Sequence, residues 1–385
     1  MLNNIYLDAA ATAQYEDKDE IIVNAMVRAM KEYWKNPSSL YASDVKEEID
    51  KCRANIAKFI GAEPSEIYFT SGASESNNWA IRGFVDHVNW NLGKDVTIIT
   101  TKIEHKSILE VIKNPRFDTI VRYCDVNENG FVDYWHLEKE LSECIFSVPL
   151  VSICMANNEI GTVQHIKIIS DLVHKYNGVL HVDATQAFGH VTINVEELGI
   201  DMMSVSGHKI SPVLKGIGFL YKRNDVEIKP LIYGSQEQGL RGGTENTFGI
   251  IGLNKALEYC DISFESIEEM INKRDYFINQ LETKFGCKLN GCNEYRLPNN
   301  INVTFPRNIT GESLLYTLEM SNIYCSVGSA CNSKSIEKSH VLKTIGLKDD
   351  EILKTIRITL PNEITYEEID KVIEEIEKSL RIIEA

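Results

Sequence analysis

The chain lacks any long hydrophobic run, and this absence excludes several classes of protein. No stretch of about 18 consecutive apolar residues occurs, as a membrane-spanning helix would need. Residues 1–20 are interrupted by acidic side chains and have no apolar core, unlike a secretory signal peptide. We therefore expect a protein that neither spans a membrane nor is exported.

Positive charge is also in deficit. The chain carries 40 lysines and arginines against 56 aspartates and glutamates, a formal net charge of −16. A broad phosphate-binding surface needs the opposite balance. Nucleic acid is therefore not expected as a direct ligand.

The nine cysteines form no recognisable pattern. Two pairs, at 287 with 292 and at 325 with 331, lack the matching histidines of a zinc site. A chain of this size does not need a disulfide framework. We expect a reducing cytoplasm, no metal site, and most thiols buried as small apolar groups.

What the chain does have is the length and composition of two globular domains. It contains 385 residues, of which 43% are hydrophobic and 25% charged. No internal repeat and no low-complexity linker interrupts it.

Predicted strands and helices alternate along the first two thirds of the chain. Apolar residues recur at helical spacing over 45–60 and 166–176, and a helix is expected from Glu75. The predicted strands are 66–70, 96–101, 148–155, 179–182 and 202–205. This order predicts an α/β fold with a mainly parallel sheet and helices on both faces. Ligands of such sheets bind beyond the carboxyl ends of the strands.

The regular alternation of predicted strands and helices ends at about residue 260. Long amphipathic helices are predicted over 264–285 and 365–383, with strands over 300–305 and 355–360 between them. We expect a large domain over 15–259. Residues 1–14 and 260–385 would form a smaller α+β domain.

Two residues at predicted strand ends point to a cofactor. Asp183 follows the strand 179–182, and Lys209 follows the strand 202–205 after Ser-Gly-His. An acid and an amine would then face one site. Pyridoxal 5'-phosphate needs this pair, because its aldehyde forms an imine with an amine and its ring nitrogen stays protonated beside a carboxylate. A solvated lysine and an aspartate in a turn or helix N-cap are the competing interpretations.

Other polar residues near predicted strand ends suit the same cofactor. Residues 71–74, Ser-Gly-Ala-Ser, join a strand to a helix, where free backbone N–H groups favour an anion. His105 could stack on a pyridine ring, although it could equally be a surface histidine. Asn158 and Gln186 offer amides that could donate to the ring's phenolic oxygen.

Taken together, these motifs resemble the class V aminotransferase-fold enzymes, and more narrowly the cysteine desulfurases of the NifS/IscS type. The likeness extends from Tyr-Leu-Asp-Ala-Ala-Ala-Thr at 6–12 to the final helix. Its most specific segments are Phe-Thr-Ser-Gly-Ala-Ser-Glu-Ser-Asn at 69–77, Asn-Asn-Glu-Ile-Gly at 157–161, His-Val-Asp-Ala-Thr-Gln at 181–186 and Ser-Gly-His-Lys at 206–209. The resemblance implies the pyridoxal-phosphate-dependent transferase fold of type I, with a seven-stranded sheet in the large domain.

The resemblance also implies the cofactor contacts. Lys209 would carry the imine, His105 would stack on the ring, and Asp183 would pair with the ring nitrogen. Asn158 and Gln186 would contact the phenolic oxygen. The phosphate would be held by Ala73, Ser74, Ser206 and His208. The segment 241–244, Arg-Gly-Gly-Thr, resembles one that crosses a dimer interface. A homodimer is therefore implied, with Thr244 reaching the phosphate in the partner subunit.

A cysteine among small residues distinguishes the possible activities. It lies in Ser-Val-Gly-Ser-Ala-Cys-Asn-Ser at 326–333, which could also be a flexible turn with a fortuitous thiol. In the resembling enzymes this cysteine, here Cys331, attacks the sulfur of the bound substrate as a thiolate. Arg357 matches the arginine whose planar fork clamps the substrate carboxylate, with Asn158 as a second substrate contact.

The expected function is a cysteine desulfurase that converts L-cysteine to L-alanine and leaves a persulfide on Cys331. An acceptor protein would take the sulfur for iron–sulfur cluster assembly or tRNA thiolation. In some of the resembling enzymes a longer tail after the last helix binds the scaffold of iron–sulfur assembly, and the resemblance without that tail leads us to expect the second kind of acceptor. Three alternatives stay open: a selenocysteine lyase, a class V aminotransferase that does not need Cys331, and an inactive scaffold that kept the fold.

Overall fold

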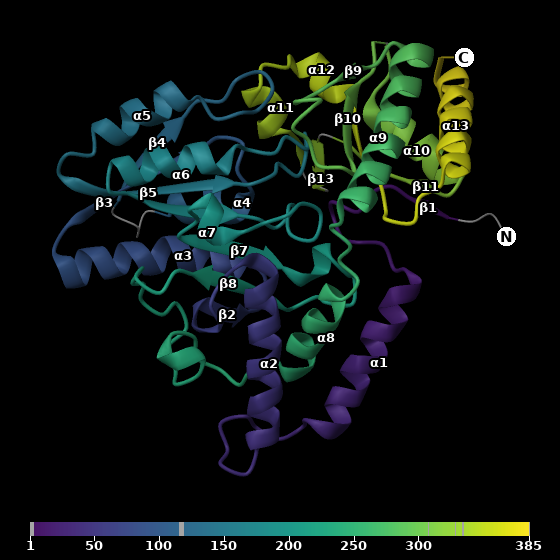
Figure 1. The fold of residues 1–385 in the computed structure, drawn as a ribbon. Coiled ribbons are helices and arrows are strands. Elements are labelled where there is room, and N and C mark those ends of the chain that lie inside the picture. The colour runs from purple at the N-terminus through teal and green to yellow at the C-terminus, as the bar shows by residue number, and fades with distance from the viewer. Residues whose placement is uncertain (1–3, 115–118, 307, 328, 333–334, 385) are drawn as a thin grey trace.

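A seven-stranded sheet forms the centre of the larger part of the molecule (Figure 1). The computed structural model describes residues 4–114, 119–306, 308–327, 329–332 and 335–384. The strand order is β2-β8-β7-β6-β5-β3-β4, and within this sheet β8 alone runs antiparallel to its neighbours. The strands are β2 (Ile67–Thr70), β3 (Asp95–Thr101), β4 (Ile120–Cys124), β5 (Ser147–Cys154), β6 (Val179–Asp183), β7 (Met202–Ser206) and β8 (Gly218–Lys222). The predicted mainly parallel, seven-stranded α/β sheet is confirmed.

Helices cover both faces of this sheet because its strands are apolar on both sides. Met202 of β7 belongs to one buried cluster and Met203 to the other, as the two-residue period of a strand requires. Helix α3 packs in the first cluster together with α4, whereas α2, α5, α6 and α8 pack in the second. These helices are α2 (Ser43–Ile60), α3 (Ala73–His87), α4 (Lys106–Ile112), α5 (Tyr134–Ser142), α6 (Ile166–Lys175) and α8 (Thr247–Leu257). α1 (Asp17–Glu32) contacts α8, and the short α7 (Val195–Leu198) precedes β7.

A second sheet, of order β12-β15-β10-β9, lies beside the first (Figure 1). Its strands are β9 (Lys288–Leu289), β10 (Asn300–Thr304), β12 (Ser326–Val327) and β15 (Thr355–Thr359). The helices around it are α9 (Phe264–Phe285), α10 (Gly311–Met320), α11 (His340–Thr344), α12 (Asp349–Leu353) and α13 (Tyr366–Glu384). β1 (Ile5–Tyr6) pairs with β11 (Ile323–Tyr324), which attaches the N-terminus to this part. Its buried cluster combines Ile5 and Leu7 with residues from Phe277 to Leu380. This separate core is compatible with the predicted small domain, and the domain boundaries stay a prediction.

The segment that carries Cys331 forms part of a β-hairpin. β13 (Ser329–Asn332) pairs antiparallel with β14 (Ser335–Lys338), and Cys331 lies opposite Ile336. The side chains of residues 328–337 lie outside the part that the structure describes. The backbone therefore places Cys331 on a hairpin rooted at β12 and α11.

Among the described helices, none combines the length and the apolar character that crossing a bilayer would take. The eight cysteines whose side chains are described form no disulfide with one another.

Candidate active site

A cavity of about 410 Å³ opens at the carboxyl ends of β6 and β7. The predicted site residues that line it are Ala73, Ser74, His105, Asn158, Asp183, Gln186, Ser206, His208, Lys209 and Arg357. Two predicted residues are not among them. Thr244 is exposed on a loop, and the Cys331 side chain lies outside the described part of the chain. The parallel strands therefore bring together residues that are far apart in sequence.

Lys209 is held in the cavity and is not an ordinary solvated lysine. It ends a single 3-10 turn, Gly207–Lys209, that directly follows β7. Its Nζ donates to the carbonyls of Ala10 at 2.6 Å and Ala11 at 2.8 Å. Loss of hydration, reinforced by the nearby Arg357 guanidinium, lowers the pKa of Lys209 to about 8. At pH 7 about a tenth of this amine is therefore unprotonated and available as a nucleophile or base, far more than for an ordinary lysine.

Asp183 ends β6 and is 5% exposed. Its Oδ1 accepts from the Thr185 backbone N–H at 3.0 Å and from the Thr185 hydroxyl. This oxygen therefore stabilises the turn after β6, as the competing interpretation of Asp183 as a turn residue expected. Its Oδ2 accepts from Nδ2 of Asn77 at 2.8 Å. The carboxylate is thus oriented by two elements, β6 and α3.

Asn77 and Ser107, which the sequence analysis did not single out, connect Asp183 to His105. Asn77 Nδ2 also donates to the Ser107 hydroxyl at 2.9 Å, and that hydroxyl lies 2.8 Å from Nδ1 of His105. The Ser107 backbone N–H donates to the same Nδ1 at 3.1 Å, because His105 is the N-cap of α4. Reduced hydration lowers the pKa of His105, so the ring is mainly neutral at pH 7.

An anion-binding arrangement lies at the N-terminus of α3. Gly72 caps the helix at φ +144°, and the first backbone N–H groups of α3 have no acceptor within the helix. The Ser206 hydroxyl faces this turn and lies 2.9 Å from Nδ1 of His208. A Cβ on Gly72 would come within 3.2 Å of the Ser206 oxygen, so a side chain there would fill the space. Serine hydroxyl, imidazole and backbone amides together suit a phosphate.

Glu75 anchors the Thr244 loop to this turn. One carboxylate oxygen accepts from the Ser71 backbone N–H at 2.8 Å. The carboxylate also forms a two-point ion pair with Arg241, at 2.8 and 3.1 Å. Arg241 lowers the pKa of Glu75 against the opposing effect of burial. The loop 241–244 is thereby attached beside the anion site of its own chain.

Arg357 projects from β15 into the other side of the cavity. Its Nη2 pairs with Oδ1 of Asp8 at 2.6 Å, and its Nη1 donates to the backbone carbonyl of Asn158 at 3.3 Å. Its Nε is buried with no acceptor among the described residues. The guanidinium therefore retains donor capacity for a carboxylate ligand. Gln186 uses its amide to donate to Ala10 at 3.0 Å, so its predicted contact with a cofactor oxygen stays a prediction.

Glu104 lies fully buried beneath the cavity, beside His105. Its Oε2 accepts from the Cys154 backbone N–H at 2.7 Å, and its Oε1 from the Thr101 hydroxyl at 2.6 Å. Burial raises the pKa of Glu104 to about 7, with a further contribution from the Asp183 charge. This carboxyl group joins β3 to β5 under the site.

Comparisons with known proteins agree with this geometry. The model of the aminotransferase class-V family matches residues 5–372. The cysteine desulfurase IscS of Dictyoglomus turgidum is 40% identical over 392 residues, covering 100% of this chain and 95% of that protein. A solved NifS-like protein superposes with a TM-score of 0.88 at 35% identity, covering 99% of this chain and 100% of that one. A solved SspA in complex with cysteine has a TM-score of 0.80 at 34% identity, covering 94% and 100%.

These findings confirm the resemblance to cysteine desulfurases that the motifs indicated. The chain belongs to the class-V aminotransferase family.

Proposed function

We propose that this protein is a pyridoxal 5'-phosphate-dependent cysteine desulfurase. The observation that carries the proposal is one cavity that holds an amine of lowered pKa, a carboxylate oriented by Asn77, and an arginine with an unused donor. Relatives that match almost the full chain are named cysteine desulfurase, and one structural neighbour was solved with cysteine.

The residues of the cavity fit the cofactor. Lys209 would hold its aldehyde carbon, Asp183 its ring nitrogen and His105 its ring face. The α3 turn with Ser206 and His208 would hold its phosphate, in a space that a Cβ on Gly72 would fill. When bound, pyridoxal phosphate captures an amine through its aldehyde and withdraws electrons through its cationic ring.

The protein's own groups would then bind the substrate and move its proton. Arg357 would bind the carboxylate of L-cysteine through Nε and the Nη atoms, sharing its guanidinium with Asp8. Lys209 Nζ, neutral above about pH 8, would take the proton from the substrate Cα. Both groups face the same cavity.

Sulfur would move to Cys331 without an external oxidant. The Cys331 thiolate attacks the substrate sulfur, an S–S bond forms, and the bond between that sulfur and Cβ breaks. The electron pair of the broken bond stays with carbon, which gains a proton. L-Cysteine and the Cys331 thiol thus become L-alanine and a Cys331 persulfide.

A homodimer is part of the proposal. Thr244 faces solvent in this chain, where a partner's site could receive it. Large apolar side chains are exposed on α1 and the loop after it, namely Ile21, Val27, Met30, Trp34, Leu40 and Tyr41. An exposed apolar face of this kind is typical of an interface between subunits. A cytoplasmic location and an acceptor in iron–sulfur or tRNA chemistry belong to the same proposal.

The deciding experiment is incubation of the cofactor-loaded protein with L-cysteine and dithiothreitol. Alanine and sulfide are expected in equal amounts. Sulfide-free conversion of a keto acid would favour an aminotransferase, and selenocysteine as the sole substrate would favour a selenocysteine lyase. A protein that forms no product with any of them would be a scaffold.

Uptake of the cofactor is expected to speed up with pH and to level off above about pH 8. Lys209 with a pKa near 8 is mainly an ammonium below that pH and a nucleophilic amine above it. An ordinary lysine would instead stay protonated up to about pH 10. Mixing cofactor-free protein with pyridoxal phosphate and following absorbance at ~410–420 nm measures the rate. A rate that keeps climbing well beyond pH 8 would contradict the lowered pKa.

A further inference from the structure

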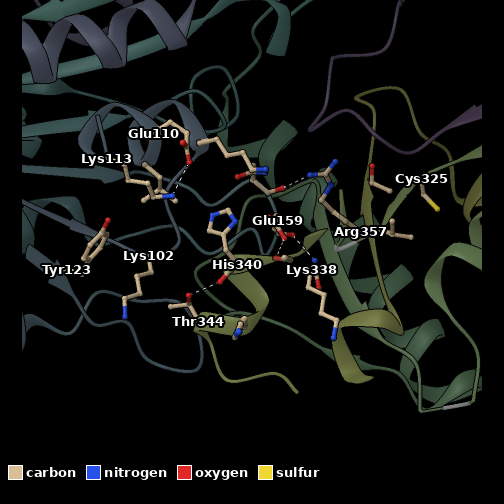
Figure 2. Close-up of a pocket in the computed structure, with 18 of the residues that line it drawn as sticks. Lys102, Glu110, Lys113, Tyr123, Glu159, Cys325, Lys338, His340, Thr344 and Arg357 are labelled. Atoms are coloured by element: carbon tan, nitrogen blue, oxygen red, sulfur yellow. Dashed lines mark hydrogen bonds and ion pairs between the residues drawn. The ribbon is translucent and has the colours of Figure 1, made fainter. Parts of the chain in front are cut away.

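A second cavity of about 850 Å³ adjoins the first, and the two share Asn158 and Arg357 in their walls. We call it the vestibule. One wall comes from the end of β3, α4 and Tyr123, and the other from residues 325–327, 338–344 and Arg357. Figure 2 shows Lys102, Lys113 and Tyr123 on one side, with His340 between them and the side that holds Arg357 and Cys325. The vestibule is about twice the volume of the inner cavity, so free cysteine would fill a small part of it.

The vestibule is basic in a chain that is acidic overall. Its walls contain Lys102, Lys106, Lys113, Lys338, Lys343, Arg357 and His340. Among the described residues of its walls, the carboxyl groups are those of Glu110 and Glu159. The whole chain, by contrast, has a net charge of −16. A concave wall of one charge concentrates ligands of the opposite charge.

Each of the two acidic residues is already engaged. Glu110 pairs with Lys113 at 3.0 Å. Glu159 is buried and accepts from the Ser339 hydroxyl at 2.5 Å, and burial raises its pKa, which favours the uncharged form. Of the cations, Lys338 pairs with Asp349 at 2.7 Å and Arg357 with Asp8 at 2.6 Å, both acids lying outside the cavity lining. The wall therefore keeps an excess of positive charge.

The vestibule lies where sulfur would leave the enzyme. Val327 and Lys338, which line it, are the two ends of the segment that forms the Cys331 hairpin. A ligand in the vestibule would therefore lie between the inner cavity and the roots of that hairpin.

We propose that the vestibule binds an acidic polypeptide segment of the sulfur acceptor and brings the acceptor's thiol to Cys331. This inference rests on the proposed desulfurase activity. In the transfer, the acceptor thiolate attacks the outer sulfur of the persulfide. A new S–S bond forms, the bond to Cys331 Sγ breaks, and Cys331 leaves as a thiolate that regains a proton. The persulfide moves from one thiol to another, so no oxidant or reductant is consumed.

The test uses the cofactor-loaded full-length protein and two synthetic peptides. Both peptides carry one cysteine; one is rich in aspartate and glutamate, and the other has asparagine and glutamine at the same positions. Transfer of labelled sulfur from cysteine to each peptide is measured at low and high salt. The acidic peptide is expected to accept sulfur about tenfold faster at low salt, and the advantage should shrink as salt screens the charges.

Two triple variants test whether the faster sulfur transfer to the acidic peptide depends on the vestibule. Lys102→Glu, Lys113→Glu and Lys343→Glu reverse charge in the vestibule at exposed positions. Lys58→Glu, Lys139→Glu and Lys284→Glu make the same change at exposed positions of α2, α5 and α9. The vestibule variant should lose the preference for the acidic peptide, and the control variant should keep it. Sulfide release driven by dithiothreitol should be unchanged in both.

The outcomes separate the inference from the proposed function. No sulfide release with dithiothreitol in the unaltered protein would refute the desulfurase activity itself. Two outcomes with normal sulfide release would overturn the vestibule proposal alone. One is equal transfer of sulfur to both peptides, and the other is an equal loss of the preference for the acidic peptide in both triple variants. A single-stranded oligonucleotide that displaces the acidic peptide and binds more tightly would also overturn it in favour of a nucleic-acid ligand.

Discussion

Replacing Lys209 by alanine is expected to abolish the absorbance at ~410–420 nm and to lower sulfide formation by about 10⁴-fold. The variant loses both the amine that would bind the cofactor aldehyde and the base that would take the substrate proton. Its fold should survive, because the Nζ contacts are two hydrogen bonds to the carbonyls of Ala10 and Ala11. Absorbance spectra and a cysteine assay measure the two losses, and circular dichroism checks the fold.

Lys215→Ala is the matched control for this prediction. Lys215 lies six positions further along the chain and is exposed. It lines neither the inner cavity nor the vestibule. Its removal should leave spectrum and activity nearly unchanged. A Lys209→Ala protein that still turns yellow and releases sulfide would refute the assignment of the amine and with it the proposed chemistry.

Replacing Cys331 by alanine should have the second largest effect. Sulfide and alanine formation are both expected to fall by at least about 10³-fold, because no thiolate is left to accept the substrate sulfur. The absorbance of the bound cofactor should persist, since the residues proposed to hold the cofactor are unchanged. Mass spectrometry of the unaltered protein after treatment with cysteine should find the added sulfur on the peptide that contains residue 331.

Cys144→Ser controls for the removal of a thiol as such. Cys144 is partly exposed beyond the end of α5 and lines neither the inner cavity nor the vestibule, and burial raises the pKa of its thiol. That variant should keep full activity. Undiminished alanine production by Cys331→Ala, with no sulfur on the protein, would mean that the substrate C–S bond breaks without this residue. A lyase that does not need this cysteine would then be the better interpretation.

The fold was predictable where hydrophobic periodicity was strong. The apolar run at 179–182 and the helical spacing over 264–285 correspond to β6 and α9. β8 and α8 were not predicted. β8 (Gly218–Lys222) is short and buried throughout, so its sequence does not alternate between apolar and polar residues, and α8 is apolar around most of its circumference, which weakens the helical period. The strands β13 and β14 were not predicted, because the small residues around Cys331 carry no strand pattern and suited a flexible turn equally well.

The sequence could identify the chemical groups of the candidate site but not the partners that orient them. Asp183 and Lys209 could be found because Asp183 ends one strand of a parallel sheet and Lys209 follows the end of the next by three residues. The partners that orient them could not, because Asn77 and Asp183 are separated by 106 positions and meet only when α3 packs beside β6. The same holds for Arg357 and Asp8, which are 349 positions apart and meet where Asp8 pairs with Thr359 at the end of β15.

By itself, the sequence determined the parallel sheet, the family and the chemical groups available at the strand ends, because these depend on local patterns of apolar and polar residues. Only the tertiary structure decided the lowered pKa of Lys209, the Asp183–Asn77–Ser107–His105 connection and the basic vestibule in an acidic chain. Loss of hydration and pairing of charges depend on which distant segments enclose a side chain. No local pattern carries that information.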